Sequence, residues 1–159
     1  LVQGGIHIPL QVVKTVNCGW GVRVLVDVPR GSFICTLAGP VITEEISHEL
    51  GTDETYMAEL DGCALCELKK YFKKDGTSGV FILYVKEAGN IGRLVNHSCS
   101  PNTFIQHVYI DTHDPRLPWA AYFAKTELKA GEEIKFDYGW VMDKTNPRGL
   151  KCRCGSTNC

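Results

Sequence analysis

The sequence predicts a mainly β fold, of α+β type with few helices, in one domain of 159 residues. Many short runs rich in β-branched and aromatic residues alternate with turn residues. One segment carries a clear helix signature. Hydrophobic residues make up 44% of the chain and charged residues 22%, which is ordinary for a globular protein that buries a real core.

Five segments have strand-like composition: residues 22–28, 32–39, 80–86, 104–110 and 119–125. The turn stretches "VPRG", "KDGTSG", "HDPRLP" and "KAGEE" punctuate them. The helix candidate is "TEEISHEL", residues 43–50, in which Thr43 can cap and Glu44 and Glu45 lie in the first turn. The stretch from residue 61 to 79 is the least regular and predicts either a short basic helix ending at Gly76 or an insertion.

The charges are unevenly distributed along a chain whose net charge is only −1. Residues 31–68 contain no Lys or Arg but many Asp and Glu residues. A solvated surface explains this arrangement, and a surface that attracts a basic partner is the sharper alternative. No apolar run is long enough for a transmembrane helix, and we expect no signal peptide.

Eight cysteines are many for this length, and three of them, Cys152, Cys154 and Cys159, fall in the last eight residues. Four disulfides in a secreted protein would be one explanation. Cys152 and Cys154 are too close in sequence to pair usefully, so metal ligands in a reducing compartment fit better than disulfides. Free thiols in a disordered tail remain an alternative.

A structural zinc site takes four ligands, so the three tail thiolates need a fourth. The candidates are Cys18, Cys35, Cys63, Cys66 and Cys99. Cys35 lies in an apolar strand and is predicted to pack in the core. Cys99, beside Pro101, would fasten the tail to the middle of the chain. Cys63 and Cys66 have zinc-like spacing, but no second such pair follows them.

Four motifs occur in a fixed order: "GWG" at 19–21, "GNIGRLVNHSCSPN" at 89–102, "GEEIKFDYGW" at 131–140 and "CRCGSTNC" at 152–159. Together they resemble the SET-domain protein lysine methyltransferases. The segment "FIQHVYIDTHDPRLPWAAYFA" is most similar to the histone H3 lysine-9 type and closest to the bifurcated SET-domain branch.

The resemblance implies a SET domain of short-stranded sheets over residues 1–140, with a short insertion region at 61–79. It also implies that the "NHSC" and "FDY" segments thread past one another like a knot. A zinc-binding post-SET tail would occupy 141–159. The pre-SET module of such enzymes is absent from these residues.

The resemblance also implies S-adenosylmethionine as methyl donor and zinc as a structural metal. Tyr138 would be the catalytic tyrosine, and Phe136 the position that sets how many methyl groups are added. The implied donor-binding residues are Cys18, Gly19, Trp20, Tyr56, Arg93, Asn96 and His97, with Glu54 a weaker candidate. The implied zinc ligands are Cys99, Cys152, Cys154 and Cys159.

The implied partners are the histone H3 tail and chromatin-associated complexes, in the nucleus, with no direct nucleic-acid site and no membrane. The tail would bind as an added strand, with Glu59 and Asp61 contacting its basic side chains. One departure is Leu37, which stands where the family has a tyrosine in the lysine channel. It raises the alternative of an inactive scaffold that binds a tail or partner. A zinc-bearing nucleic-acid module is a third class, which the near-neutral charge disfavours.

Overall fold

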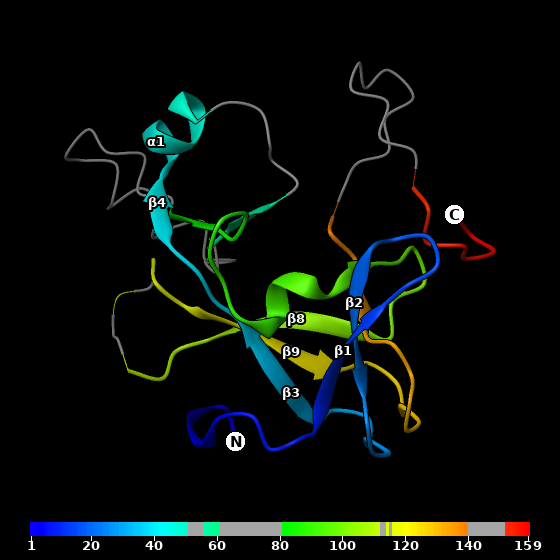
Figure 1. Ribbon diagram of the computed structural model, residues 1–159. Coiled ribbons are helices and arrows are strands. Elements are labelled where there is room, and N and C mark those ends of the chain that lie inside the picture. Colours follow the sequence, from blue (N-terminus) through cyan, green and yellow to red (C-terminus); the bar gives the residue numbers. More distant parts are fainter. Residues whose placement is uncertain (51–55, 61–80, 112–113, 115, 140–151) are drawn as a thin grey trace.

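The computed structural model describes residues 1–50, 56–60, 81–111, 114, 116–139 and 152–159, and the rest is drawn in grey (Figure 1). The sequence predictions for Glu54, Asp61, Cys63, Cys66 and the 61–79 region therefore fall outside the described residues. The described elements follow one another in this order: η1 (Val2–Gly4), β1 (Leu10–Lys14), β2 (Trp20–Val24), β3 (Phe33–Leu37), β4 (Val41–Thr43), α1 (Glu44–Glu49), β5 (Met57–Glu59), β6 (Phe81–Tyr84), η4 (Ile91–Leu94), β7 (Asn96–His97), β8 (Thr103–Val108), β9 (Trp119–Ala124) and β10 (Lys135–Phe136).

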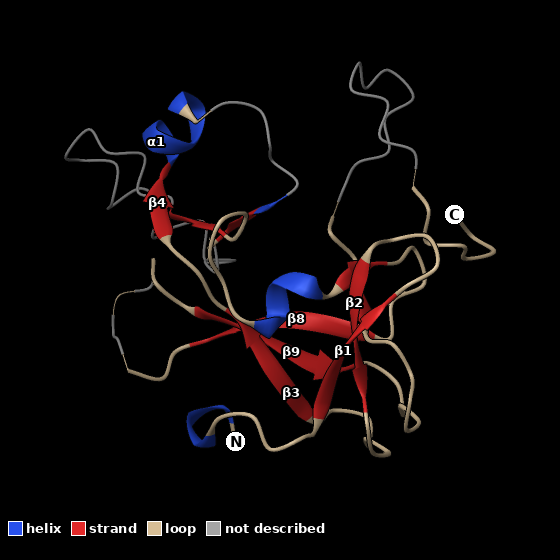
Figure 2. Cartoon of the chain, in the orientation of Figure 1, coloured by secondary structure: helices blue, strands red, loops and turns tan. Residues whose placement is uncertain are grey.

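The strands of the described residues form small sheets rather than one large one. They are the hairpin β1-β2, the antiparallel sheets β3-β9-β8 and β4-β6-β5, and the parallel pair β10-β7. In Figure 1 the β1-β2 hairpin stands at one end of the β3-β9-β8 sheet, and β4 and α1 stand away from the sheet. The predicted mainly β class is confirmed, and strands dominate Figure 2.

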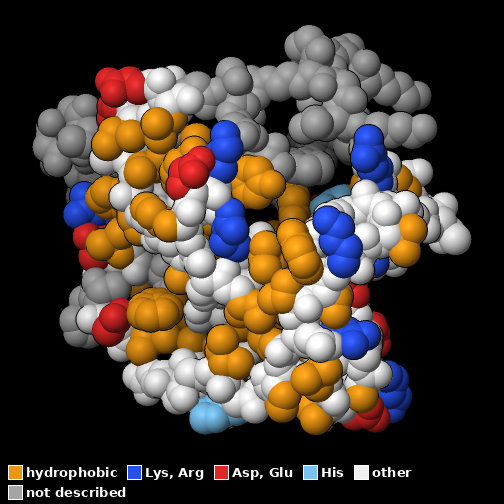
Figure 3. All heavy atoms as spheres, viewed as in Figure 1, with side chains coloured by type: hydrophobic (Ala, Val, Ile, Leu, Met, Phe, Trp, Pro, Cys, Tyr) orange, Lys and Arg blue, Asp and Glu red, His pale blue; other side chains and the backbone are white. Residues whose placement is uncertain are grey.

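Each of the five predicted strand segments overlaps a strand, but the observed strands are shorter or shifted. The segment 22–28 is strand only to Val24, and Leu25 and Val26 are 45% and 42% exposed. Apolar residues therefore continue beyond the end of the strand at exposed positions. Figure 3 shows that hydrophobic side chains cover much of the face seen in Figure 1. β1, β4, β5, β7 and β10 were not predicted. The last two are two residues long, which is too short for a periodic signal.

The predicted helix is present as α1. The side chain of Thr43 accepts a hydrogen bond from the backbone N–H of Ile46, and Glu44 and Glu45 occupy the first turn, as the capping pattern predicts. No helix of the described residues is long and apolar enough to cross a bilayer.

The core lies between the β3-β9-β8 sheet, the β1-β2 hairpin and the segment leading to β10. Its largest fully buried side chains include Tyr122, Ile34, Leu128 and Ile134. Burying one such side chain stabilises the fold by about 1.5–3 kcal/mol. Cys35 is fully buried as predicted, and burial raises the pKa of its thiol to about 12, so this sulfur packs as an apolar group.

Candidate functional site

Two segments far apart in the sequence run side by side at the centre of the site. β7 and β10 pair in parallel, with Asn96 opposite Lys135 and His97 opposite Phe136. The backbone N–H of Ser98 extends the pairing by donating to the Phe136 carbonyl at 2.9 Å. The two segments that the resemblance implied would thread past one another are therefore in direct contact.

Hydrogen bonds of the Asn90 side chain fix the segment that leads into β7. Its side-chain amide donates to the Thr36 carbonyl at 2.7 Å, and its side-chain oxygen accepts from the backbone of Ala38 and Gly92 at 3.1 Å each. Gly92 packs so closely on β3 that an added Cβ would lie 2.3 Å from the Thr36 carbonyl oxygen. Sequence reasoning did not single out Asn90, which caps η4 and is of a residue type preferred at helix N-caps.

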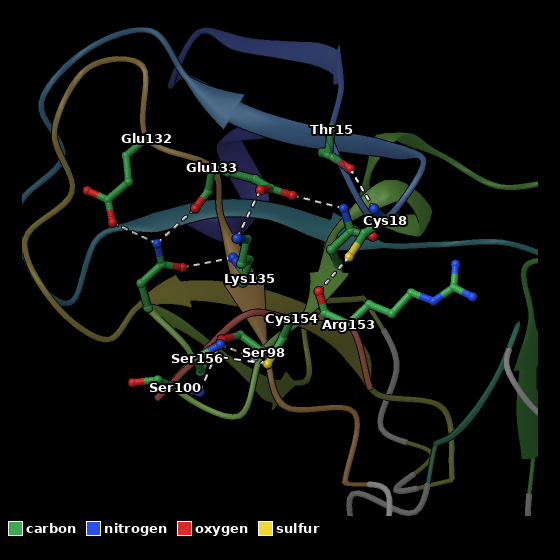
Figure 4. A network of polar contacts seen from close by, with 12 residues as sticks. Thr15, Cys18, Ser98, Ser100, Glu132, Glu133, Lys135, Arg153, Cys154 and Ser156 are labelled. Atoms are coloured by element: carbon green, nitrogen blue, oxygen red, sulfur yellow. Dashed lines mark hydrogen bonds and ion pairs between the residues drawn. The ribbon is translucent and has the colours of Figure 1, made fainter. Parts of the chain in front are cut away.

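A second set of hydrogen bonds, made by the Asn102 side chain, fixes β10 and the residues before it. The side-chain nitrogen of Asn102 donates to Glu132 Oε1 at 2.8 Å and to the Glu133 carbonyl at 2.9 Å, and its oxygen accepts from the Lys135 backbone at 2.8 Å (Figure 4). The buried hydroxyl of Thr103 donates to the Lys135 carbonyl at 2.8 Å. Both backbone groups of Lys135 are thus bound by residues that directly follow the "NHSCSP" stretch.

The β7-β10 pair borders a large cavity of about 1460 Å³. Its walls include β2, η4, β7, β10, the sheet β3-β9-β8 and the cysteine tail. Of the residues expected to bind the donor or act in catalysis, all those that the structure describes line it: Cys18, Gly19, Trp20, Tyr56, Arg93, Asn96, His97, Phe136 and Tyr138. The structure thus brings these nine residues, spread over most of the chain, to one cavity.

Tyr138 is held by its ring, its backbone and its hydroxyl. The hydroxyl donates to the Val95 carbonyl at 2.8 Å, and the backbone N–H donates to His97 Nδ1 at 3.2 Å. Its ring packs against Phe136, with centroids 4.7 Å apart, and against the edge of His97 at 5.3 Å. Burial, with smaller contributions from Tyr56, Cys18 and Glu133, raises the pKa of Tyr138 to about 12, so the phenol is neutral at physiological pH.

His97 connects this tyrosine to the cysteine cluster. Its Nδ1 accepts the Tyr138 N–H, and its Nε2 lies 3.4 Å from Cys99 Sγ. Asn96 points the other way. Its side-chain nitrogen donates to the Trp20 carbonyl at 3.0 Å and to Glu133 Oε1 at 2.8 Å, which ties β7 to the start of β2.

The loop before β2 forms the outer wall of the cavity. Gly19 has a φ of +75°, a conformation that glycine adopts without strain. Trp20 is 54% exposed, so it is not a core anchor, and the ammonium of Lys14 lies 5.1 Å from the centroid of its ring. Cys18 donates from its thiol to the Arg153 carbonyl at 3.6 Å, which joins this loop to the tail (Figure 4).

Two further expected donor contacts differ in character. Tyr56 is 39% exposed at the cavity edge. Arg93 lines the cavity, but its guanidinium donates to the carbonyls of Val85, at 2.7 Å, and Lys86. These bonds make Arg93 a brace for the turn after β6. Leu37, where the resemblance expects a tyrosine, is 5% exposed and also lines the cavity.

The four predicted zinc ligands converge. The sulfurs of Cys99, Cys152, Cys154 and Cys159 all lie within 4.8 Å of one another, and Cys99 and Cys152 are 3.9 Å apart. Four thiolates around Zn²⁺ at about 2.3 Å stand roughly 3.8 Å from each other, so the cluster fits a tetrahedral zinc site. Cys99 is the residue from outside the tail that completes the cluster, while Cys18 and Cys35 lie elsewhere.

The tail also has polar anchors of its own. Ser156 Oγ lies 3.0 Å from the hydroxyl of the buried Ser98, and the side-chain amide of Asn158 donates to the Cys99 carbonyl at 2.9 Å. Hydrogen bonds from the Cys99 backbone and Ser156 lower the pKa of Cys154 to about 5. One thiolate is therefore favoured before any metal binds.

The chain is similar to a known protein family and to several characterised proteins. The family model described as "SET domain" matches residues 19–139. Met-2 of Caenorhabditis elegans, a histone-lysine N-methyltransferase, is 28% identical over 253 residues, which cover 100% of this chain and 19% of met-2. SUVH6 of Arabidopsis thaliana, an H3 lysine-9 specific histone-lysine N-methyltransferase, is 34% identical over 179 residues, covering 100% of this chain and 22% of SUVH6.

Solved structures agree with this comparison. The crystal structure of Arabidopsis SUVH6 in complex with SAM has a TM-score of 0.80 at 34% identity, covering 100% of this chain and 34% of that one. KRYPTONITE in complex with DNA, an H3(1-15) peptide and SAH has a TM-score of 0.74 at 30% identity, covering 97% of this chain and 29% of that one. This chain spans about a fifth of the length of met-2 and SUVH6. Since the family model matches more than half of its residues, the chain belongs to the SET-domain family.

Proposed function

We propose that this domain transfers methyl groups from S-adenosylmethionine to a lysine of the histone H3 tail, with lysine-9 as the target. The observation that carries the proposal is the convergence of β7, β10 and the cysteine tail on one cavity, with Tyr138 anchored in its wall. The names of the relatives and the donor complex of SUVH6 support the reaction. The H3 peptide bound to KRYPTONITE supports the substrate class.

The donor fits the wall formed by the loop before β2 and by β7. Cys18 and Gly19 offer backbone groups, and Gly19 has no side chain to keep a ligand away. Trp20 and Tyr56 offer partly exposed aromatic faces. Asn96, His97 and Arg93 complete the proposed set. Bound there, S-adenosylmethionine supplies an electrophilic methyl group on a sulfonium centre.

The remaining walls suit a lysine side chain. A free lysine has a pKa of about 10.4, so its amine must lose a proton before it can attack. Leu37, Phe136 and Val95 contribute apolar atoms to the cavity wall, and desolvation by such atoms lowers the pKa of an amine. Tyr138, neutral and fixed on the Val95 carbonyl, orients the amine. Alignment of this kind can lower a barrier by roughly 7 kcal/mol or more.

Phe136 lines the cavity and carries no hydroxyl there. We propose that this leaves room for a second and a third methyl group. An inactive scaffold, the alternative raised by Leu37, is not favoured, because Tyr138 keeps its anchors and the relatives are named as methyltransferases.

Zinc would be held by Cys99, Cys152, Cys154 and Cys159, and would supply a cross-link between tail and core. In this role the metal contributes folding energy to the last residues. The boundaries of the SET domain at 1–140 and of the tail at 141–159 stay predictions, as does the branch within the family.

The H3 tail would add as a strand beside β5, which among the described residues pairs with β6 alone. Glu59 is exposed on β5 and could bind basic side chains of the tail. Action on histones implies a nuclear, chromatin-associated protein, and chromatin complexes as partners are part of this proposal.

The test is methyl transfer to an H3(1-15) peptide, followed by mass spectrometry, with a peptide carrying Arg in place of lysine-9 as the substrate control. We expect transfer by the wild type and a loss of at least about a hundredfold in Tyr138→Phe. Tyr109→Phe removes a hydroxyl at a 48% exposed position outside the cavity and serves as the matched control. Equal transfer by Tyr138→Phe and the wild type would refute the assigned role.

A further inference from the structure

A second phenol, that of Tyr122 on β9, has no role in the scheme above. Its side chain is fully buried, yet it borders the same cavity as Leu37 and Phe136. Ala120 faces Leu37 across the β3-β9 ladder, and Tyr122, two residues further along β9, projects to the same side of the sheet as Ala120. The phenol therefore belongs to the floor of the cavity.

Two contacts fix the ring and hydroxyl of Tyr122. Its hydroxyl donates to the Gly92 carbonyl at 3.2 Å. Its ring meets Phe136 edge to face, with centroids 5.1 Å apart and planes at 75°. Burial raises the pKa of Tyr122 well above its ordinary value, so the hydroxyl remains a donor at any pH at which the enzyme works.

The Gly92 carbonyl leads to Tyr138 in two steps. It also accepts the backbone N–H of Val95, at 3.2 Å, which closes the turn of η4. The carbonyl of the same Val95 accepts the Tyr138 hydroxyl at 2.8 Å. A continuous series of hydrogen bonds thus runs from the Tyr122 phenol through Gly92 and Val95 to the Tyr138 phenol. The ring of Phe136 bridges the two tyrosines a second time, because it packs on both.

We propose that Tyr122 is a positioning residue, which sets the place of the Tyr138 hydroxyl through the Gly92–Val95 turn and the Phe136 ring. Tyr122 does not touch substrate. Its hydroxyl keeps the Val95 carbonyl aimed at Tyr138, and its ring keeps Phe136 against the Tyr138 ring. The proposal rests on the proposed function only for its consequence in turnover, because the bonds themselves exist without substrate.

The test removes the Tyr122 hydroxyl and keeps the ring. Tyr122→Phe is expected to lower the single-turnover methylation rate about fivefold, the factor that corresponds to one ordinary hydrogen bond. The KM for peptide and the Kd for the donor should stay within about twofold. In a Tyr138→Phe background the same change should have no further effect on the rate, since it acts through Tyr138. Equal effects in both backgrounds would overturn the proposal.

A spectroscopic arm keeps the inference separate from the function. With ¹³Cζ-labelled tyrosine, the Tyr138 resonance at pH 8 should move in Tyr122→Phe and stay in place in Tyr109→Phe, in which the lost hydroxyl lies outside the cavity. If the wild type transfers no methyl group, the proposed function fails, and this shift still decides the inference. A Tyr138 resonance unchanged in Tyr122→Phe would overturn it in either case.

Discussion

The hydrogen bonds of the Asn102 side chain yield the most direct prediction about stability. Asn102→Ala removes three hydrogen bonds, all with donor–acceptor distances of 2.8 or 2.9 Å, to Glu132, Glu133 and Lys135. Each such bond contributes about 0.5–1.5 kcal/mol net. We therefore expect the variant to lose about 2–4 kcal/mol of unfolding free energy, or roughly 5–15 °C in Tm for a chain of this size.

Urea denaturation followed by circular dichroism measures this loss, with the midpoint compared at an unchanged m-value. Gln106→Ala is the matched control. It removes one exposed hydrogen bond, from the side-chain amide of Gln106 to the carbonyl of His107, the next residue of β8. The control should stay within about 0.5 kcal/mol of the wild type. A similar small change for Asn102→Ala would show that β10 is held by other contacts and would refute the reasoning.

Three further predictions concern the metal, the packing of η4 and the response to alkali. Cys154→Ser should lower the zinc content per chain measured by mass spectrometry, while Cys18→Ser, whose sulfur lies outside the cluster, should keep it; equal zinc in both would contradict the ligand set. Gly92→Ala should destabilise the fold by about 2 kcal/mol or more, because its Cβ would lie 2.3 Å from the Thr36 carbonyl oxygen, and a stability equal to the wild type in urea would show that β3 can move aside. The folded state raises the pKa of Tyr138 from 10.0 to about 12, so it holds this proton more tightly than the unfolded chain. Stability should therefore be unaffected by this group below about pH 10 and fall between 10 and 12, and Tyr138→Phe should reduce that fall; an identical fall in the variant would contradict the assignment.

Sequence reasoning worked best where the signal is local. The Thr43 cap with Glu44 and Glu45 after it predicted α1, because capping depends on neighbouring residues only. The apolar stretch around Cys35 predicted a buried strand for the same reason. The order of the four motifs identified the family, since each motif is contiguous in the sequence.

The hydrogen bonds of Asn90 and Asn102 could not be predicted in this way. Asn102 binds groups 30 to 33 residues away, and Asn90 binds the Thr36 carbonyl 54 residues away. No local pattern announces such partners. Tyr122 looks like an ordinary strand aromatic in "WAAYFA", and only its neighbours Gly92 and Phe136 give it a possible role.

By itself, the sequence determined the mainly β class and the helix α1, and it predicted the residues that we propose carry the chemistry. The tertiary structure decided which cysteine completes the cluster with the tail, and how Tyr138 is held. The physical reason is that β7 and β10 are two residues each and gain their order from pairing with one another. A strand of that length has no periodicity to detect, so its existence follows from the contacts that folding brings together.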